Sequence, residues 1–295
     1  MDTSTDTEVN PFFTVSSLPY QLPPFDRIED AHYLPAFTRG MVEQLAEIDA
    51  IAGVTEPPTL ENTLIPLERS GELLTRVETV FFSLNAADTN DLMDEIRSEM
   101  APKLAAHRDK ILLNGALFKR VKALYEVRDV LEIDAESRRL IEEFYTDFVR
   151  AGAELSDADK ERMQVINAEL AGLQTTFSQN VLSEVNASAV VVDTREELAG
   201  ISANQIAAAA EAAAARDLDG KYVIALRNTS GQPVLSSLED RALRERIMDT
   251  SLARGSQGGE FDNRNVVVRI ASLRAERAAM LGYPNHAAYI LERQT

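Results

Sequence analysis

The chain has 295 residues, contains no cysteine and carries a formal net charge of −18 at pH 7. This length is enough for one large domain or two ordinary ones, and 45% hydrophobic residues are enough for a packed core. The lack of cysteine excludes disulfides and thiolate metal sites. The acidity disfavours nucleic acid as a partner, because that affinity depends on clustered lysine and arginine.

The start of the chain has the composition of a polar tail rather than of a targeting signal. The first residues, MDTSTDTEVNPFF, lack the basic stretch followed by an apolar stretch that is typical of a signal peptide. No apolar run approaches the roughly eighteen residues that a membrane-spanning helix needs. We therefore expect a cytoplasmic protein that does not bind membranes.

Residues 1–25 are expected to form a disordered start, residues 1–9, followed by an extended arm, residues 10–25. Proline blocks a helix within the arm, which contains Pro11, Pro19, Pro23 and Pro24. The arm also carries many apolar side chains, so we expect it to lie across the outside of a helical body.

A helical part is predicted for residues 26–186, because apolar residues recur there at steps of three and four. Pro102 predicts a kink in one of its helices. The helices expected before the last one cover residues 30–52, 59–84, 91–113, 115–128 and 134–153.

The longest predicted helix covers residues 156–185 and ends this helical part. Ser156 and Asp157 supply oxygens that can cap its first backbone amides. At 1.5 Å per residue it spans roughly 45 Å, so other elements have to pack along it. The apolar face of this central helix carries Met163, Ile166, Leu170, Leu173, Phe177 and Val181.

Residues 187–295 form a third part, which is helical with short strands. Ala189–Val192 and Lys221–Leu226 are β-branched or apolar runs that could pair as a small ribbon. Helices are predicted for residues 202–216, 233–253 and 262–281, and a last short helix begins at Pro284. The fold class expected from these patterns is mostly α.

The chain has three histidines, His32, His107 and His286. None of them has a second histidine four residues further on, so the HExxH motif of zinc peptidases is missing. We interpret each one as a partly buried or surface residue rather than as a metal ligand.

Other short patterns also have structural interpretations. Gly255, Gly258 and Gly259 precede no phosphate-binding pattern and indicate a mobile linker. The sequence DLDG at residues 217–220 is similar to a calcium loop, but its glycine is misplaced, and a capped turn is the better interpretation. The N-x-S sequons at Asn186 and Asn228 have no role in a cytoplasmic protein.

Pairs of neighbouring carboxylates could in principle do acid–base chemistry, as at Glu142–Glu143 and Glu196–Glu197. With 48 Asp and Glu residues such pairs arise by chance, and solvated helix faces explain them. The run Arg241–Arg246 predicts an exposed face with many ion pairs. From residue chemistry alone, we assign no catalytic, cofactor-binding or metal-binding residue to this chain.

Several stretches, in unchanged order, resemble the peptidyl-dipeptidases (dipeptidyl carboxypeptidases) and their oligopeptidase A relatives, within the thimet oligopeptidase and neurolysin family. The resemblance covers residues 10–294, with small departures at Ala225, where proline is expected, and at His286, where an aromatic is common. The stretches are LPYQLPPFDRIEDAHYLPAF, TLENTLIPLERSGELLTRVETVFFSLNAADTND, SDADKERMQVINAELAGLQTTFSQNV, KYVIALRNTSGQP, LEDRALRERI and RGSQGGEFDNRNVVVRIASLRAERAAMLGYPNHAAYIL.

The resemblance implies an almost entirely helical, clam-shaped fold with zinc deep in a channel between two halves. It also implies an activity that removes C-terminal dipeptides from oligopeptides. In this family the HExxH helix, a further zinc-binding glutamate and the substrate-positioning tyrosine and histidine groups lie in the later half. None of them has a counterpart here, so the resemblance implies zinc for the full-length family and no metal ligand in this chain.

Two hypotheses follow for this chain. In the first, it is the N-terminal part of a peptidyl-dipeptidase, ends before the catalytic half, forms one wall of the channel for short peptides and is inactive alone. In the second, it is a stand-alone helical module that binds peptides or a protein without enzymatic activity. The first hypothesis also predicts bare apolar surface, most of all at Pro284–Leu291, and self-association through it.

Overall fold

The computed structural model of this chain describes residues 10–226 and 232–294. Two expectations, the disorder of residues 1–9 and the sequon at Asn228, lie outside the described residues. Within them the chain is mostly helical, as predicted, and no helix is both long and apolar enough to cross a lipid bilayer. The α-helices are α1 (Tyr33–Ala52), α2 (Ile65–Arg69), α3 (Glu72–Ala87), α4 (Asp91–Leu112), α5 (Gly115–Val127), α6 (Ala135–Ala151), α7 (Asp157–Ala187), α8 (Ala203–Ala214), α9 (Arg241–Leu252), α10 (Arg264–Met280) and α11 (His286–Leu291).

The chain folds into two compact units. Unit 1 comprises Met1–Gly172 and Leu273–Thr295, and unit 2 comprises Leu173–Ser272. Unit 1 is therefore built from two stretches of sequence, and both boundaries fall inside helices, α7 and α10. The division expected from sequence, into residues 1–25, 26–186 and 187–295, instead placed its boundaries at the ends of predicted elements. That division stays a prediction.

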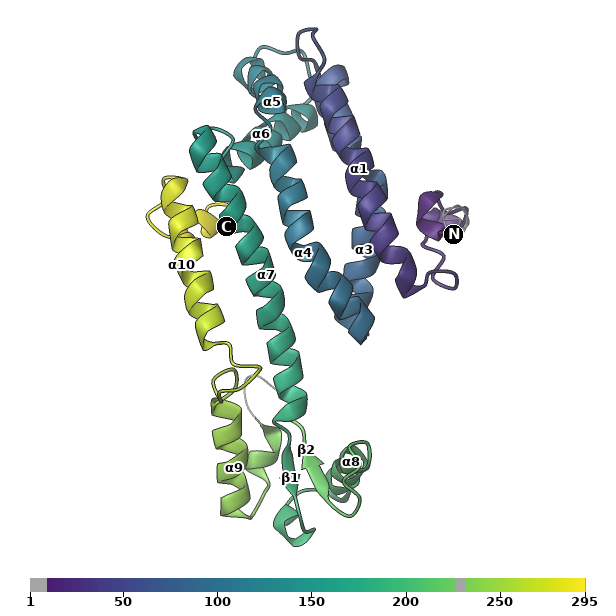
Figure 1. Cartoon of the computed structure of the whole chain (residues 1–295), viewed down its shortest axis with the longest axis vertical. Coiled ribbons are helices and arrows are strands. Elements are labelled where there is room, and N and C mark those ends of the chain that lie inside the picture. The colour runs from purple at the N-terminus through teal and green to yellow at the C-terminus, as the bar shows by residue number, and fades with distance from the viewer. Residues whose placement is uncertain (1–9, 227–231, 295) are drawn as a thin grey trace, which may run out of the picture. The chain divides into compact units, whose positions relative to one another are not determined.

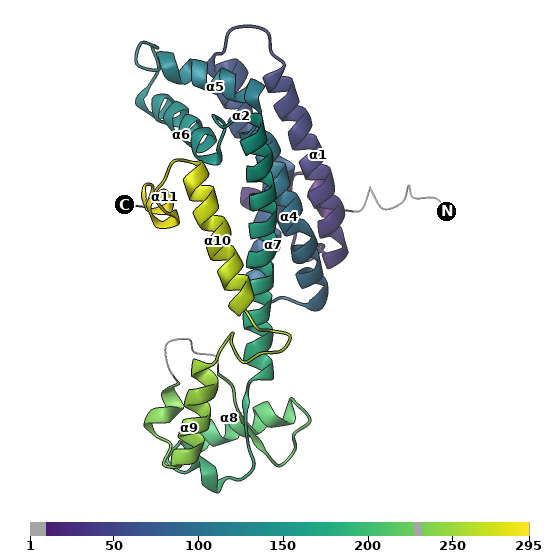
Figure 2. The same cartoon turned by 60° about the vertical axis from the view of Figure 1, so that its left-hand side comes forward.

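The first core of unit 1 lies between α1, α3 and α4, which Figure 1 shows together. Figure 2 shows α1 and α4 side by side. Aromatic rings at its centre meet edge to face: the Phe81 ring centroid lies 5.0 Å from that of Tyr33 and 5.3 Å from that of Phe37. This geometry is favoured because the positive edge of one ring meets the negative face of another. Phe12 of the N-terminal arm packs against Tyr33 and anchors the arm to this core.

The helices α1 and α3 approach each other closely at Gly40. A Cβ atom placed on Gly40 would lie 2.9 Å from both the backbone nitrogen and the Cα atom of Leu74. Only a residue without a side chain lets the two backbones come so near. Gly40 therefore sets the distance at which the aromatic side chains of the two helices interlock.

A buried arginine organises the other end of unit 1. Arg120 on α5 is 7% exposed, and its guanidinium makes five hydrogen bonds, all to neutral acceptors. Two go to the hydroxyl of Thr63 and one to the side-chain oxygen of Asn62, while the carbonyls of Val54 and Glu56 accept the others. Because every N–H of a buried guanidinium needs an acceptor, Arg120 fixes the loop that follows α1.

Unit 2 contains the predicted ribbon. The strands β1 (Val190–Val192) and β2 (Tyr222–Ile224) pair antiparallel, with Val190 opposite Ile224. Figure 1 shows α8 beside β2 and α9 beside β1. The apolar side chains of the ribbon and of α9 form a core of their own, which comprises Val190, Val192, Leu198, Ile224, Leu226, Leu238, Leu243 and Ile247.

The long helix α7 has nearly the predicted bounds and the predicted cap, since the Ser156 hydroxyl accepts from the amide of Asp159 at 3.2 Å. Its apolar face is buried at Met163, Ile166 and Leu170, but Phe177 is partly exposed. The stripe predicted from spacing is thus a core face along the first half of the helix.

Two predicted helices prove to be broken. The helix expected over residues 59–84 is interrupted at Gly71, whose φ of 77° lies in the left-handed region, and α3 then continues beyond Asn85 to Ala87. The helix expected over residues 233–253 splits into a 3-10 turn, Pro233–Ser236, and α9. There the Asp240 carboxylate accepts from the amide of Leu243, which starts a new helix instead of continuing the old one.

The close contact at Gly40 yields a prediction about stability. The substitution Gly40→Ala should destabilise unit 1 by about 1–3 kcal/mol, because the added methyl group forces α1 and α3 apart. Urea denaturation followed by far-UV circular dichroism measures this change. Gly172→Ala is the matched control: an added Cβ meets nothing within 4 Å there, and the helix should gain about 0.5–1 kcal/mol. Equal behaviour of the two variants would contradict the assigned role of Gly40.

Arg120 yields a second prediction. The substitution Arg120→Lys keeps the charge but loses the planar fork, and leaves acceptors around Thr63 unsatisfied, so we expect a loss of about 2–4 kcal/mol in the same denaturation experiment. Lys119→Arg, at the exposed neighbouring position, should change stability by less than about 0.5 kcal/mol. A stable Arg120→Lys variant would show that the guanidinium network is dispensable.

Candidate functional site: a polar cluster on α6

The three histidines singled out in the sequence have separate structural settings. The ring of His32 accepts from the amide of Glu29 at 3.0 Å and helps to start the first helix. His107 is buried, and its Nε2 lies 2.6 Å from the side-chain oxygen of Gln44 on α1. His286 is the first residue of α11, beside the ring of Tyr289. Each histidine thus belongs to a different helix junction.

The acidic pairs are largely engaged by basic groups. Glu142 and Glu143 both pair with Arg139 on the same helix, and Glu143 also pairs with Arg293. Glu197 accepts from the amide and hydroxyl of Thr194, as the cap of a short turn. These contacts support the interpretation of the pairs as structural.

The remaining candidates are also part of turns and helix faces. Gly255, Gly258 and Gly259 all have positive φ values, which suits a tight loop before α10. In the run Arg241–Arg246, Arg244 donates to the carbonyl of Leu238 and Arg246 pairs with Glu197, so the predicted face of ion pairs is partly turned toward the backbone.

The sequence resemblance implied zinc only for the full-length family. The structure allows a test of whether side chains of this chain could bind a zinc ion. Among residues 10–226 and 232–294, no three histidine, aspartate or glutamate side chains are grouped as a metal ion would require. Structural and catalytic zinc sites use at least three such protein ligands. The described side chains therefore do not fit zinc, and we derive no reaction step through it.

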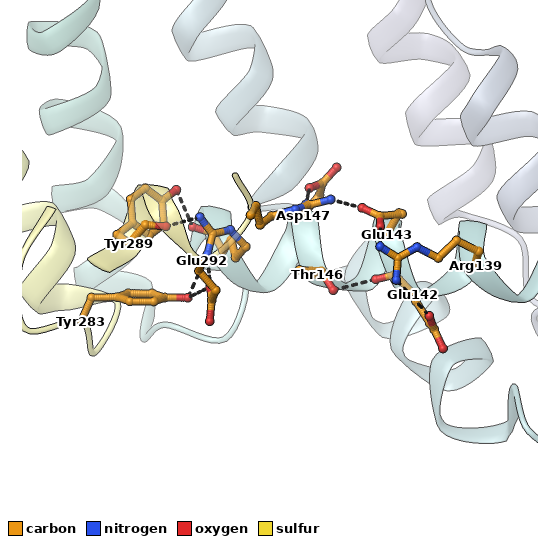
Figure 3. Close-up of polar contacts among 10 residues, drawn as sticks. Arg139, Glu142, Glu143, Thr146, Asp147, Tyr283, Tyr289 and Glu292 are labelled. Atoms are coloured by element: carbon orange, nitrogen blue, oxygen red, sulfur yellow. Dashed lines mark hydrogen bonds and ion pairs between the residues drawn. The ribbon is translucent and has the colours of Figure 1, made fainter. Parts of the chain in front are cut away.

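The densest polar contacts of unit 1 lie where the C-terminal segment meets α6, and Figure 3 shows this group of side chains. We call it the α6–α11 polar cluster. It contains three arginines, two tyrosines, four acidic residues and one threonine: Arg139, Glu142, Glu143, Thr146, Asp147, Arg150, Tyr283, Tyr289, Glu292 and Arg293.

Arg150 is the central member of the cluster. Its side chain is 12% exposed and donates to the Tyr283 hydroxyl at 3.0 Å, to the Glu292 carboxylate and to the carbonyl of Tyr289. Its guanidinium also lies over the Tyr289 ring, 4.4 Å from the centroid, where the cation meets the negative face. The Tyr289 hydroxyl in turn donates to the Arg150 carbonyl at 3.2 Å. Arg150 and Tyr289 therefore each donate a hydrogen bond to the backbone carbonyl of the other.

A second arginine extends the cluster along α6. Arg293 donates to the carboxylates of Asp147 and Glu143, which lie one turn apart on the same face of α6. Figure 3 shows Thr146 beside Glu142, whose carbonyl accepts from the Thr146 hydroxyl at 2.7 Å. The negative stripe of α6 is thereby neutralised by the end of the chain.

The electrostatics of the cluster favour fastening rather than catalysis. Burial raises the pKa of Tyr283, and the hydrogen bond that its hydroxyl donates to Glu292 raises that pKa further. The phenol therefore stays protonated at neutral pH. A general base would need a carboxylate free to accept a substrate proton, whereas Glu292, Glu143 and Asp147 each hold an arginine.

Sequence patterns did not reveal Arg150 or Arg293 as partners of distant residues. The contacts of Arg150 join residues 133 to 142 positions apart in the chain. Helical periodicity only reports neighbours three or four residues away. The one usable signal was the stripe Glu143, Asp147 and Arg150, which marks a charged face of α6 and does not say what covers it.

The cluster leads to a prediction about the docking of α11. The substitution Arg150→Met should destabilise unit 1 by about 1–3 kcal/mol, because it removes charge-assisted bonds and leaves Glu292 without its arginine. Hydrogen exchange of residues 283–294 should speed up more than that of the rest of the unit.

The matched control is Arg139→Met, which removes an exposed arginine whose ion pairs, within the described part of the chain, are with carboxylates of its own helix. Such pairs contribute little, so its effect should be below about 0.5 kcal/mol. Unchanged exchange of residues 283–294 in Arg150→Met would show that apolar packing alone holds α11.

No family model matches the chain. Among curated proteins, it is 43% identical over 288 residues to the dipeptidyl carboxypeptidase of Escherichia coli K12 and 42% identical over 285 residues to that of Salmonella typhimurium LT2. These matches cover 98% and 97% of this chain and 42% of each relative. Oligopeptidase A of Escherichia coli K12 is 27% identical over 94% of this chain and 41% of the relative. The chain is therefore a homologue of the dipeptidyl carboxypeptidases and oligopeptidases A along nearly its whole length, and spans about two fifths of theirs.

Proposed function

We propose that this chain is the non-catalytic N-terminal region of a zinc metallopeptidase that removes C-terminal dipeptides from oligopeptides. It forms one wall of the substrate channel and is inactive alone. The observation that carries the proposal is the identity of 43% over 98% of this chain, combined with coverage of only 42% of the relative. The match extends over 288 residues, which supports the assignment of the chain to one region of such an enzyme.

The side-chain chemistry of the described residues agrees with a non-catalytic role. Metal-assisted peptide hydrolysis needs an activated water, a general base and a group that stabilises the oxyanion. The acidic side chains of the α6–α11 polar cluster are held by Arg139, Arg150 and Arg293, which leaves them little capacity to act as a base. The proposed role of this region is therefore to shape the space in which peptides bind.

A wall of this kind has to be rigid, and the packing of unit 1 supplies rigidity. The interlocked aromatic rings around Phe81 and the bonded guanidinium of Arg120 both resist deformation, because close-packed and fully bonded groups have few alternative arrangements. A rigid wall limits substrates by size, which suits short unfolded peptides. We also propose that the protein works in the cytoplasm.

The second candidate is a stand-alone module that binds peptides or a protein. One observation favours it: each unit has a buried apolar core of its own, so folding needs no further chain. The two candidates differ in what the isolated chain can bind. A module should bind peptides tightly by itself, whereas one wall of a channel offers only part of the contacts.

An activity assay tests the proposal. The purified chain, incubated with zinc and short oligopeptides, should release no C-terminal dipeptide detectable by mass spectrometry. The full-length Escherichia coli dipeptidyl carboxypeptidase serves as the positive control under the same conditions. Zinc-dependent release by this chain, abolished by a chelator, would refute the proposal.

Two further measurements separate the candidates. Calorimetric titration of the chain with the same oligopeptides should show weak or no binding for a channel wall, and saturable binding for a module. The DNA after codon 295 can also be read: an in-frame HExxH motif supports the peptidase region, and its absence there favours the module.

A further inference from the structure

A buried carboxylate with an unusual hydrogen-bonding state lies inside unit 1. Asp109 on α4 is 5% exposed, and its Oδ1 accepts from the side-chain amide of Asn167 on α7 at 2.9 Å. Its Oδ2 is buried and has no hydrogen-bond partner among the described residues. An ionised carboxylate can accept about four hydrogen bonds, so Asp109 is far from satisfied as an anion.

The hydrogen bonds continue from Asn167 to a third helix. The Asn167 side-chain oxygen accepts from Nη1 of Arg277 on α10 at 3.3 Å. One amide thus joins α4, α7 and α10, and it stands between a carboxylate and a guanidinium that do not bond each other directly. Because Arg277 reaches Asp109 only through Asn167, its positive charge compensates an ionised Asp109 only in part.

The surroundings of Asp109 oppose its ionisation. Burial raises its pKa from 3.8 to about 6, although the hydrogen bond from Asn167 and the charges of Arg108 and Arg277 act in the opposite direction. The charged groups that act on it are Arg108 from α4 and Arg277 from α10, while α7 contributes the neutral Asn167. Two histidines titrate nearby: burial lowers the pKa of His107 on α4 and of His286 on α11. Burial also lowers the pKa of Arg277, and the charge of Arg274 adds to that effect.

We propose that Asp109, Asn167 and Arg277 form a proton-sensitive latch, which holds the C-terminal end of α10 and α11 against α4 and α7 when Asp109 is protonated and loosens when it is ionised. A neutral carboxyl group places no net charge in this buried position, whereas an ionised carboxylate there needs further hydrogen-bond donors such as water. Water that enters competes with the bond between Asn167 and Arg277.

The latch connects to the α6–α11 polar cluster. The Arg277 guanidinium lies over the ring of Tyr289, 5.5 Å from its centroid, and Arg150 lies over the same ring. Loss of the bond to Asn167 loosens Arg277, which is one of the two cations that pack on this ring. Ionisation of one carboxylate on α4 is therefore transmitted to the contact that fastens α11.

The direction of the pH effect follows from the raised pKa. A carboxyl whose pKa is higher in the folded form binds its proton more tightly there, so folding is favoured wherever the proton is bound. The stabilisation from the latch is fully present below pH 3.8 and is lost as the pH rises through about 6. Between pH 5 and pH 7.5, linkage predicts about a tenfold fall in the closing equilibrium of the latch.

Hydrogen exchange with mass spectrometry on the whole chain tests this inference. After correction for the intrinsic exchange rate, protection of residues 273–291 should fall about tenfold from pH 5 to pH 7.5. In Asp109→Asn, the tenfold fall should be absent, because the amide keeps an acceptor for Asn167 and cannot ionise; His286, whose pKa is lowered by burial, changes protection in the opposite direction in both proteins. Asp91→Asn, an exposed position on the same helix, should retain the tenfold change.

Equal protection at both pH values in the unsubstituted chain would overturn the latch, and so would a tenfold fall that persists in Asp109→Asn. A titration of the Asp109 carboxyl carbon by nuclear magnetic resonance keeps the test open if that variant does not fold. A midpoint near pH 6 supports the latch, and a midpoint at or below about pH 4, the ordinary range for aspartate, overturns it.

Discussion

The guanidinium of Arg150 makes the contact on which the assembly of unit 1 depends. That unit consists of two stretches, which Leu173–Ser272 separates in the sequence, so contacts between the two stretches must hold it together. Arginine suits this task because its planar group stays charged and offers several donors in fixed directions. Arg150 uses them on a phenol, a carboxylate and a backbone carbonyl of the returning segment, and stacks on Tyr289.

Buried polar groups serve two different ends in this unit. Arg120 has acceptors for its donors and is therefore a rigid joint between α5 and the loop after α1. Asp109 has a partner for only one of its oxygens, so its energy depends on whether it carries a proton. The same low dielectric environment makes the satisfied group stable and the unsatisfied group responsive. The rigidity at Arg120 and the response of Asp109 to pH thus have the same physical cause, the low dielectric environment of the interior.

The homology to the peptidases can be set beside the contacts that hold the helices of unit 1 together. The homology extends over nearly the whole chain and covers about two fifths of the length of the relatives. Within unit 1, arginine–carboxylate contacts fasten helices and neutralise the acidic stripe of α6. The contact at Gly40 and the rings around Phe81 serve the same purpose, because they hold α1 and α3 at one separation.

Local pattern in the sequence was enough for the helical class, the span of α7 with its Ser156 cap, and the ribbon of Val190–Val192 with Tyr222–Ile224. Each depends on residues close together in the chain or on a strong run of β-branched side chains. It was also enough for the family resemblance, which depends on the order of many short stretches. Tertiary structure alone decided the break at Gly71, the partners of Arg150 and the burial of Asp109. These features depend on which distant helix lies opposite a residue, and helical periodicity places a residue on a face without naming what covers that face.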